Sequence, residues 1–332
     1  MMKVLIPMAV YFLIVSGCKG QGRPVRYRDT VFSAVTVEPD LTYRSPPPAG
    51  KRGKAYRFDM YVPGDGDARG GSSTLATGTG GAAGRPLIIW MHGGGFKFGS
   101  RKANGTRFWC TGFARRGYLC AAINYRLSRK NTLGNFKDLV KGCFDAVEDA
   151  REAVAYFKTH YKTWNIDTGR IILGGNSAGG MIALQAAYSK PNDLLKLAGG
   201  TGQPMNALGG GVAAVINFWG ALFEASWLNN ARVPIVSVHG GRDRIVYPGR
   251  KGEYLFGSLA IQAKADSLSI PNRVKIYDGY SHELQKHFNP FFVGRATKSR
   301  WREAGQFAAD FLYSEVVTKE SPGAQKVVKS PI

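Results

Sequence analysis

A serine between closely spaced glycines is the first residue whose surroundings point to chemistry. Ser177 lies in Gly175-Asn176-Ser177-Ala178-Gly179, after the apolar run Ile171-Ile172-Leu173 and at the start of an apolar segment with helical spacing. A serine at a tight turn from a buried strand into a helix exposes its hydroxyl above the sheet. Glycines relieve the steric crowding of such a turn, and a helix N-terminus favours developing negative charge. Ser177 is therefore a candidate nucleophile for acyl transfer.

A second glycine-rich segment lies earlier in the chain. His92-Gly93-Gly94-Gly95-Phe96 follows an apolar run that ends at Met91. Three consecutive glycines leave backbone N–H groups free to converge on an oxyanion. Together with the N–H of Ala178, just after Ser177, they could bind the oxygen of a tetrahedral intermediate. The alternative is a plain glycine-rich turn, and the pairing with the serine turn favours the oxyanion role.

A serine nucleophile needs a base, and the chain has five histidines. His282 is favoured because it follows the predicted strand 274–277 and a short turn, and α/β sites form at the carboxyl ends of strands. His287, predicted to lie inside a helix, is a distant second candidate. His92 is predicted to brace the glycine loop. His160 is predicted to lie on the surface, and His239 is predicted to have a structural role.

The base in turn needs a carboxylate that orients the imidazole and stabilises its charged form. Asp243 is favoured because it lies in the loop straight after the predicted strand 234–239. The order serine, aspartate, histidine along the chain also fits such a site. Glu224 and Asp278 are the competitors, but Glu224 precedes the required strand and Asp278 is very close in sequence to His282.

These residues fall at the ends of elements that alternate along the chain. Segments 31–44 and 56–62 alternate in polarity and predict a hairpin. From residue 86 onwards, short apolar runs typical of strands buried on both faces alternate with segments of helical periodicity. This order predicts an α/β fold with a mostly parallel central sheet, helices on both faces and an antiparallel N-terminal hairpin. The later strands are predicted at 86–91, 118–124, 170–174, 212–218, 234–239 and 274–277, and the helices at 108–116, 137–161, 178–188, about 249–267 and 299–316.

The motifs resemble the α/β-hydrolase superfamily, and within it carboxylesterases with an HGGG loop, such as the hormone-sensitive-lipase-like and acetyl-xylan/feruloyl-esterase-like groups. They are HGGGF at 92–96, GNSAGG at 175–180, HGGRDRIV at 239–246 and GYSH at 279–282. The resemblance runs from about residue 31 to 315. It implies an α/β-hydrolase fold and hydrolysis of carboxylic esters through an acyl-enzyme, without a metal or an organic cofactor. It also implies Gly94, Gly95 and Ala178 as oxyanion donors.

The chain departs from the hormone-sensitive-lipase-like pattern at its start. That group carries a helical cap before its first strands, whereas residues 18–55 are short, basic and strand-like, so we expect no large cap domain. The stretch 189–211 and the aromatic segment 219–227 could cover the site only in part. An open cleft suits an acyl group carried on a bulky or polymeric substrate, so we expect esters of short-chain or aromatic acyl groups, including those on polysaccharide. A serine peptidase on the same fold and a non-catalytic binding lipoprotein remain the alternatives.

The N-terminus has the features of an export signal. A charged start at Lys3 precedes the apolar run 4–15, which is too short to span a bilayer comfortably, and small residues follow. Val15-Ser16-Gly17-Cys18 resembles the bacterial lipobox, which implies cleavage before Cys18 and acylation of its thiol. The alternative is an ordinary secretory signal with a chance cysteine. We expect an exported protein, either a membrane-anchored lipoprotein (periplasmic or at the cell surface) or a secreted one.

The predicted organisation has four parts: a signal peptide over 1–17, a tether over 18–30, a catalytic domain over 31–316 and a flexible tail over 317–332. The expected partners are a small-molecule or polysaccharide-linked ester and, through the anchor on Cys18, a membrane. No nucleic-acid-binding motif is present, so nucleic acid is not expected. The sequence makes no prediction of oligomeric state.

The chain of 332 residues is strongly basic, with 45 lysines and arginines against 23 aspartates and glutamates, a formal charge of +22. Such a field attracts anionic partners, but the basic residues are scattered, which favours a generally basic surface over a dedicated polyanion site. None of the four cysteines forms a C-x-x-C pair, which argues against a zinc or redox motif. In an oxidising compartment, one bridge, between Cys110 and Cys143, is a candidate.

Overall fold

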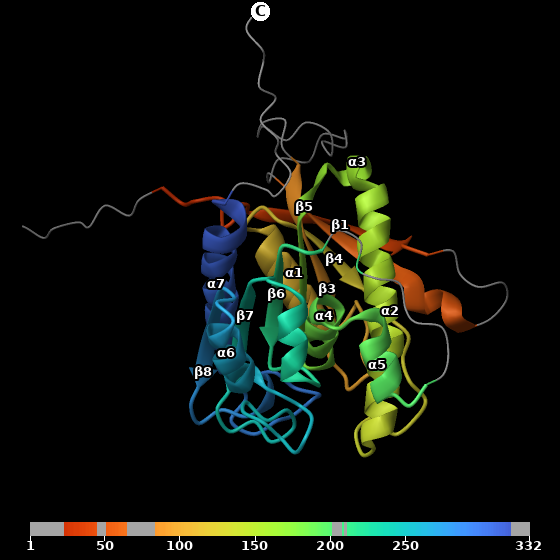
Figure 1. The fold of residues 1–332 in the computed structure, drawn as a ribbon. Helices are drawn as coiled ribbons and strands as arrows, with labels where there is room; N and C mark the ends of the chain where they lie inside the picture. Colours follow the sequence, from red (N-terminus) through yellow and green to blue (C-terminus); the bar gives the residue numbers. More distant parts are fainter. Residues whose placement is uncertain (1–22, 45–50, 65–83, 201–207, 209–210, 320–332) are drawn as a thin grey trace, which may run out of the picture.

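One eight-stranded sheet forms the centre of the protein (Figure 1). The structure, a computed structural model, describes residues 23–44, 51–64, 84–200, 208 and 211–319. The strand order is β1-β2-β4-β3-β5-β6-β7-β8. Strand β2 pairs antiparallel with β1 and β4, and the pairs from β4 through β3 to β8 are parallel. The strands are β1 (Ala34–Thr42), β2 (Arg57–Gly64), β3 (Arg85–Met91), β4 (Leu119–Ile123), β5 (Ile166–Asn176), β6 (Ala214–Phe218), β7 (Ile235–Gly240) and β8 (Asn272–Tyr277). The predicted α/β fold with an antiparallel N-terminal hairpin is confirmed.

Helices cover both faces of this sheet, as the uniformly apolar central strands require. Successive residues of a strand point to opposite faces, so Ile88 and Trp90 join one hydrophobic cluster while Leu87 and Ile89 join the other. Helices α1 (Asn104–Ala114) and α7 (Arg295–Leu312) pack on the first face. On the second face lie α2 (Phe136–Thr159), α3 (Tyr161–Trp164), α4 (Ala178–Tyr188), α5 (Pro191–Leu197) and α6 (Ser258–Ser267).

Short helical turns complete the described part of the chain. They are η1 (Lys51–Tyr56), η2 (Ala225–Asn230), η3 (His282–Leu284) and the single π-turn η4 (Tyr313–Val317) that extends α7. Within the described ranges, no helix combines the length and the apolar character needed to cross a membrane. The residues of η3 lie just beyond β8, and this places them at the edge of the sheet where β5 and β7 also end.

The helix predicted over 249–267 is wrong in its first half, because α6 begins only at Ser258. Gly252 has a φ of +66°, and Phe256 forms isolated bridges with Leu222 and Arg250. A Cβ at Gly257 would lie 2.0 Å from the carbonyl oxygen of Tyr247. The segment therefore folds back on itself instead of winding into a helix.

The helix predicted around His287 is also wrong. The chain beyond η3 bends, and His287 is exposed in this bend. The side chain of Asn289 accepts hydrogen bonds from the N–H groups of Phe291 and Phe292, and Gln285 Oε1 accepts one from the N–H of Asn289. Such local side-chain contacts with the backbone compete with helix formation.

The candidate disulfide between Cys110 and Cys143 is not formed. Cys110, Cys120 and Cys143 are free and buried. Cys110 lies on α1, in the cluster of the first sheet face, whereas Cys143 lies on α2, in the cluster of the second face. The sheet separates the two sulfur atoms, and a bridge between them would require a short Cβ–Cβ distance.

The chain before β1 is packed against the ends of α1 and β4. Tyr27 donates its backbone N–H to the carbonyl of Arg116, and its ring contacts that of Tyr118. The N–H groups of Val31 and Phe32 both donate to the backbone carbonyl oxygen of Arg115. The part of the predicted tether that the structure describes is thus in contact with the domain. The predicted signal peptide (1–17), Cys18 and most of the predicted tail (320–332) lie outside the described residues.

Candidate active site

Ser177 occupies a strained turn between β5 and α4. Its φ of 55° and ψ of −120° are rare for a residue with a side chain. The flanking glycines make the turn sterically feasible. A Cβ at Gly175 would lie 2.4 Å from the carbonyl carbon of Gly179, and a Cβ at Gly179 would lie 2.0 Å from the carbonyl oxygen of Met91. The predicted strand–turn–helix around Ser177 is present.

The three residues that the sequence selects as nucleophile, base and carboxylate form one hydrogen-bonded chain. Ser177 Oγ lies 2.9 Å from His282 Nε2, and His282 Nδ1 lies 2.7 Å from Asp243 Oδ2. The side chains come from the turn after β5, the loop after β7 and the turn after β8. The serine is the most exposed of the three, at 9%. This arrangement can take a proton from the hydroxyl and stabilise the imidazolium that results.

The environment of Asp243 keeps its carboxylate ionised. Its second oxygen, Oδ1, accepts the backbone N–H groups of Ile245 and Val246 at 2.9 and 3.0 Å. Burial alone would raise the pKa of Asp243, but its contacts with His239 and His282 outweigh burial and hold the pKa well below its ordinary value. Because one oxygen is held by the loop, the other is fixed toward His282.

His239 supports this loop, in line with the structural role expected for it. It is fully buried at the end of β7. Its Nε2 lies 2.9 Å from the carbonyl oxygen of Val246 and its Nδ1 lies 2.8 Å from Ser258 Oγ. Because the Ser258 hydroxyl donates to Nδ1 of His239, the Nε2–H of His239 donates to the carbonyl oxygen of Val246. This hydrogen bond connects the far side of the Asp243 loop to the sheet.

The glycine loop lies directly beside the serine. A Cβ at Gly93 would be 2.8 Å from Asn176 Nδ2 and 3.4 Å from Ser177 Cβ. Gly94 and Gly95 have φ values of +119° and +61°, a region in which glycine carries no steric penalty. Among the described residues, neither N–H group donates a hydrogen bond to the protein. Together with Ala178, the first residue of α4, they are the predicted oxyanion donors.

His92 braces this loop, as its place in the sequence suggests. Its Nδ1–H donates to the carbonyl of Gly93 at 2.7 Å, and its ring stacks on Tyr125 with centroids 4.3 Å apart. The Tyr125 hydroxyl donates in turn to the carbonyl of His92 at 2.8 Å. Burial lowers the pKa of His92 to about 4, so the ring is neutral at physiological pH.

Two residues of α7 that the sequence did not single out hold the turn that carries His282. The two residues after the histidine, Glu283 and Leu284, have φ values of 56° and 59°. Trp301 Nε1 donates to the carbonyl of Glu283 at 2.8 Å, and Arg300 Nε donates to that of Leu284 at 2.8 Å. No local pattern links these positions to the histidine, because the contact exists only once α7 has packed on the sheet.

The alternative candidates are not brought to this site. His160 is exposed and stacks on Tyr156, and Asp278 is exposed beside Gly241. In the described part of the chain, neither Glu224 nor Asp278 forms a hydrogen bond or ion pair with His282. The aromatic segment 219–227, expected to cover the site in part, belongs mainly to the core, since Trp219, Phe223 and Trp227 are buried in the two hydrophobic clusters.

A metal-binding group is not found in the described ranges: no three histidine, cysteine, aspartate or glutamate side chains gather as ligands there.

Comparison with known proteins gives sequence relatives among esterases. The family model BD-FAE matches residues 76–224, slightly less than half of the chain. Gut esterase 1 of Caenorhabditis elegans is 28% identical over 104 residues, which cover 31% of this chain and 18% of that protein. The Arabidopsis thaliana protein named Probable carboxylesterase 6 is 37% identical over 122 residues, which cover 34% of this chain and 33% of that protein. The matched part of the chain thus spans about a third or less of the length of these curated relatives.

Solved structures of one bacterial esterase share the fold over nearly their whole length. Thermogutta terrifontis esterase 2 phosphorylated by paraoxon is 20% identical, with a TM-score of 0.56 over 87% of this chain and 97% of that chain. The propionate-bound form of the same protein is 18% identical, with a TM-score of 0.54 over 85% and 94%. This similarity shows that the sheet and its helices are those of the α/β-hydrolase fold.

Proposed function

We propose that this chain is a serine carboxylesterase that works through an acyl-enzyme, because it has the α/β-hydrolase fold and matches the BD-FAE family model over residues 76–224. The observation that carries the proposal is the hydrogen-bonded chain from Ser177 Oγ through His282 to Asp243, with links of 2.9 and 2.7 Å. The sequence relatives are named as esterases, which supports ester bonds as the target.

In the first half of the reaction, Ser177 Oγ attacks the ester carbonyl carbon while His282 Nε2 takes the hydroxyl proton. The carbonyl π electrons move onto oxygen, and the N–H groups of Gly94, Gly95 and Ala178 stabilise the oxyanion. Asp243 stabilises the imidazolium without taking its proton. The tetrahedral intermediate collapses, the C–O bond to the alcohol breaks, and the imidazolium protonates the leaving oxygen.

In the second half, water replaces the alcohol. His282 removes a proton from the water as it attacks the acyl-serine, and the same oxyanion donors stabilise the second intermediate. Its collapse releases the carboxylic acid and returns the proton to Ser177 Oγ. Loss of one oxyanion donor from such a site costs roughly 3 kcal/mol of barrier, which corresponds to a rate loss of about 10²- to 10³-fold.

Exposed apolar side chains on the loops around the serine support a short-chain or aromatic acyl group as the substrate. Phe98 follows the glycine loop, Ile245 follows Asp243, and Phe292 lies beyond the His282 turn; all three are exposed. Leu133, also exposed, touches the glycine loop, because its Cδ2 lies 2.3 Å from the position that a Cβ at Gly95 would take. These exposed side chains are available for apolar contact with an acyl group, and we propose that the alcohol can be bulky, including a sugar of a polysaccharide.

The test is hydrolysis of a panel of p-nitrophenyl esters with acetyl, butyryl and longer chains, together with feruloyl esters and acetylated xylan. We expect Ser177→Ala to lose activity by on the order of 10³-fold or more. Ser267→Ala is the matched control, because this serine is exposed on α6 and donates only to Lys264. If Ser177→Ala keeps most of the activity while it remains folded, the proposal is wrong.

A fluorophosphonate probe separates this proposal from its alternatives. The esterase from Thermogutta terrifontis is phosphorylated by paraoxon, and an activated serine in this chain should react with organophosphorus reagents in the same way. A non-catalytic binding protein with this fold would not be labelled. A serine peptidase would be labelled but would cleave peptide substrates faster than esters.

We also propose export and anchoring through an acylated Cys18, on the basis of the N-terminal sequence alone. The test is fractionation of cells that produce the full chain. The wild-type protein should sediment with membranes, and Cys18→Ala should be released from them. A Cys18→Ala protein that still fractionates with lipid would contradict the anchor.

A further inference from the structure

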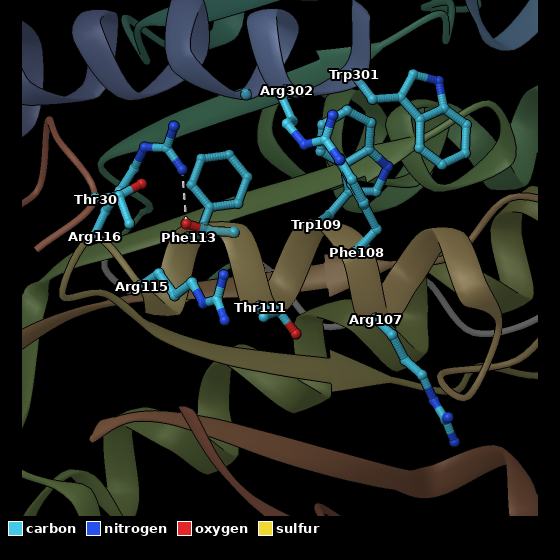
Figure 2. A pocket seen from close by; sticks show the side chains of 12 residues that line it. Thr30, Arg107, Phe108, Trp109, Thr111, Phe113, Arg115, Arg116, Trp301 and Arg302 are labelled. Carbon is cyan, nitrogen blue, oxygen red and sulfur yellow. Dashed lines mark hydrogen bonds between the residues drawn. The ribbon is translucent and has the colours of Figure 1, made fainter. Parts of the chain in front are cut away.

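A cavity of about 460 Å³ lies between α1 and α7, on the helix layer that covers the first face of the sheet (Figure 2). Its size is within the range of small-molecule sites. One wall is aromatic: Phe108 is partly exposed there, and Phe113 and Trp301 lie almost fully buried behind it, while Gly112 and Gly305 leave space beside it. None of the triad residues lines it, so it is separate from the candidate active site.

Arginines surround this cavity. Arg107, Arg115 and Arg116 come from α1 and its C-terminal end, and Arg302 comes from α7 on the opposite side. Within the described part of the chain, none of the four has a carboxylate within ion-pair distance, whereas Arg101 and Arg126 each contact several. The cavity therefore carries positive charge that the surrounding protein does not neutralise.

Arg116 is held in place by neutral groups. Its guanidinium donates to the carbonyls of Arg28 and Gly112 and to Gln306 Oε1, at 3.2, 2.8 and 2.8 Å. The neighbouring carboxylates are engaged elsewhere: Asp29 pairs with Arg28, and Asp310 accepts from Gln306. The Arg116 guanidinium is thus held in one position while it keeps its positive charge. This reduces the entropy cost of ordering the side chain when an anion binds.

The N-terminal segment closes one side of the cavity. Thr30 lines it, and the backbone N–H groups of Val31 and Phe32, the next two residues, both donate to the backbone carbonyl oxygen of Arg115 at 2.9 Å. Trp301 packs on the opposite side, against Phe108 and Trp109, with ring centroids 5.4 and 5.3 Å apart. Three separate stretches of chain therefore shape the cavity, which makes it more than a scatter of surface charge.

We propose that this cavity binds a carboxylate carried on a sugar ring, as in the uronate units of an acidic polysaccharide. The planar guanidinium forks match carboxylate geometry, and charge-assisted hydrogen bonds of this kind are the strong ones. A bare anion would leave the exposed part of the Phe108 ring unused, whereas the apolar face of a sugar ring can lie against it. The proposal does not depend on the catalytic step, because no residue of the cavity belongs to the triad.

The experiment is calorimetric titration of the Ser177→Ala protein with trigalacturonate, a neutral glucose trisaccharide and inorganic phosphate. Because this variant cannot hydrolyse through Ser177, binding is measured whether or not the protein is an esterase. Quenching of tryptophan fluorescence gives a second readout, since Trp109 and Trp301 line the cavity. We expect trigalacturonate to bind at least about tenfold more tightly than either of the other two ligands.

Two variants test the cavity itself. Arg115→Gln/Arg302→Gln removes two unpaired charges, and Gly112→Leu fills the space while keeping every arginine; a Cβ at Gly112 meets only Arg116 Nη1, at 3.9 Å. Both should weaken trigalacturonate binding about tenfold or more. The matched control is Arg232→Gln/Arg273→Gln, which removes two exposed arginines that do not line the cavity.

Three results would overturn the proposal. The first is absence of trigalacturonate binding. The second is a result in which Arg115→Gln/Arg302→Gln and Arg232→Gln/Arg273→Gln weaken trigalacturonate binding equally, or in which Gly112→Leu has no effect on it. Either outcome would mean that the general positive charge of the protein, and not the cavity, attracts the ligand. The third is phosphate binding as tight as that of trigalacturonate, which would mean an anion site without recognition of the ring.

Discussion

Trp301 on α7 donates its indole N–H to the carbonyl oxygen of Glu283, the residue directly after His282, at 2.8 Å. Glu283 and Leu284 both have left-handed backbone conformations, which cost free energy unless the surroundings hold them. The histidine is therefore positioned by a residue that does not touch it or the serine. Trp301 is a positioning residue, and its contribution can be measured.

Trp301→Phe should lower kcat about five- to tenfold, because one hydrogen bond to the turn is worth roughly 1 kcal/mol, while KM changes little. The measurement is steady-state hydrolysis of a short p-nitrophenyl ester. Trp164→Phe is the matched control: its indole also donates a hydrogen bond, to Glu38, but far from the triad. If the two variants affect kcat equally, Trp301 acts only through global stability.

Asp243→Asn should reduce kcat by on the order of 10³- to 10⁴-fold. The amide keeps the shape of the side chain, but it can donate to His282 Nδ1 and so favour the tautomer whose Nε2 carries a proton and cannot act as a base. The rate is measured beside the thermal stability of the variant. A folded Asp243→Asn protein with nearly full activity would show that another carboxylate orients the histidine.

The sequence was sufficient for the fold and for the three residues of the hydrogen-bonded chain. Uniformly apolar runs such as Ile171-Ile172-Leu173 predict buried strands directly, and Ser177 follows such a run, whereas His282 follows the strand 274–277, which includes Lys275. The contacts of Trp301 could not be predicted in this way, since they depend on how α7 packs. The pairing of Cys110 failed for a related reason: periodicity shows that a residue is buried but not which face of the sheet it lies on.

Gly179→Ala should lower activity at least about tenfold and destabilise the fold by roughly 1–3 kcal/mol. The new Cβ would lie 2.0 Å from the Met91 carbonyl oxygen, so the turn that carries Ser177 must move. Gly112→Ala is the control, because its helix position is open and alanine there should add up to about 1 kcal/mol of stability. Denaturant unfolding and ester hydrolysis of both variants provide the test, and a fully active Gly179→Ala protein would contradict the tight turn.

The cysteines of the described core should be unreactive in the folded protein. Cys110, Cys120 and Cys143 are free and buried, and burial raises the pKa of the Cys110 and Cys143 thiols, so little of the reactive thiolate forms. Iodoacetamide should label the three only after denaturation, as read by peptide mass spectrometry. Rapid labelling of the native protein, or a disulfide-linked peptide that contains Cys110 and Cys143, would contradict the structure.

His92 should make stability depend on pH in a defined window. Its ordinary pKa is 6.5, and burial lowers it to about 4 in the folded protein. Between these values the unfolded chain binds a proton that the folded protein does not, so the free energy of unfolding rises with pH. The contribution is complete above pH 6.5 and is lost as the pH falls toward 4, to a total of about 3 kcal/mol.

The measurement is denaturant unfolding of the wild type and of His92→Gln at several pH values from 4 to 7.5. The variant loses the stacking on Tyr125 and is less stable at pH 7.5, but the difference between the two proteins should shrink as the pH falls, because only the wild type must keep a histidine neutral. A difference that stays constant with pH would mean that His92 is protonated without cost.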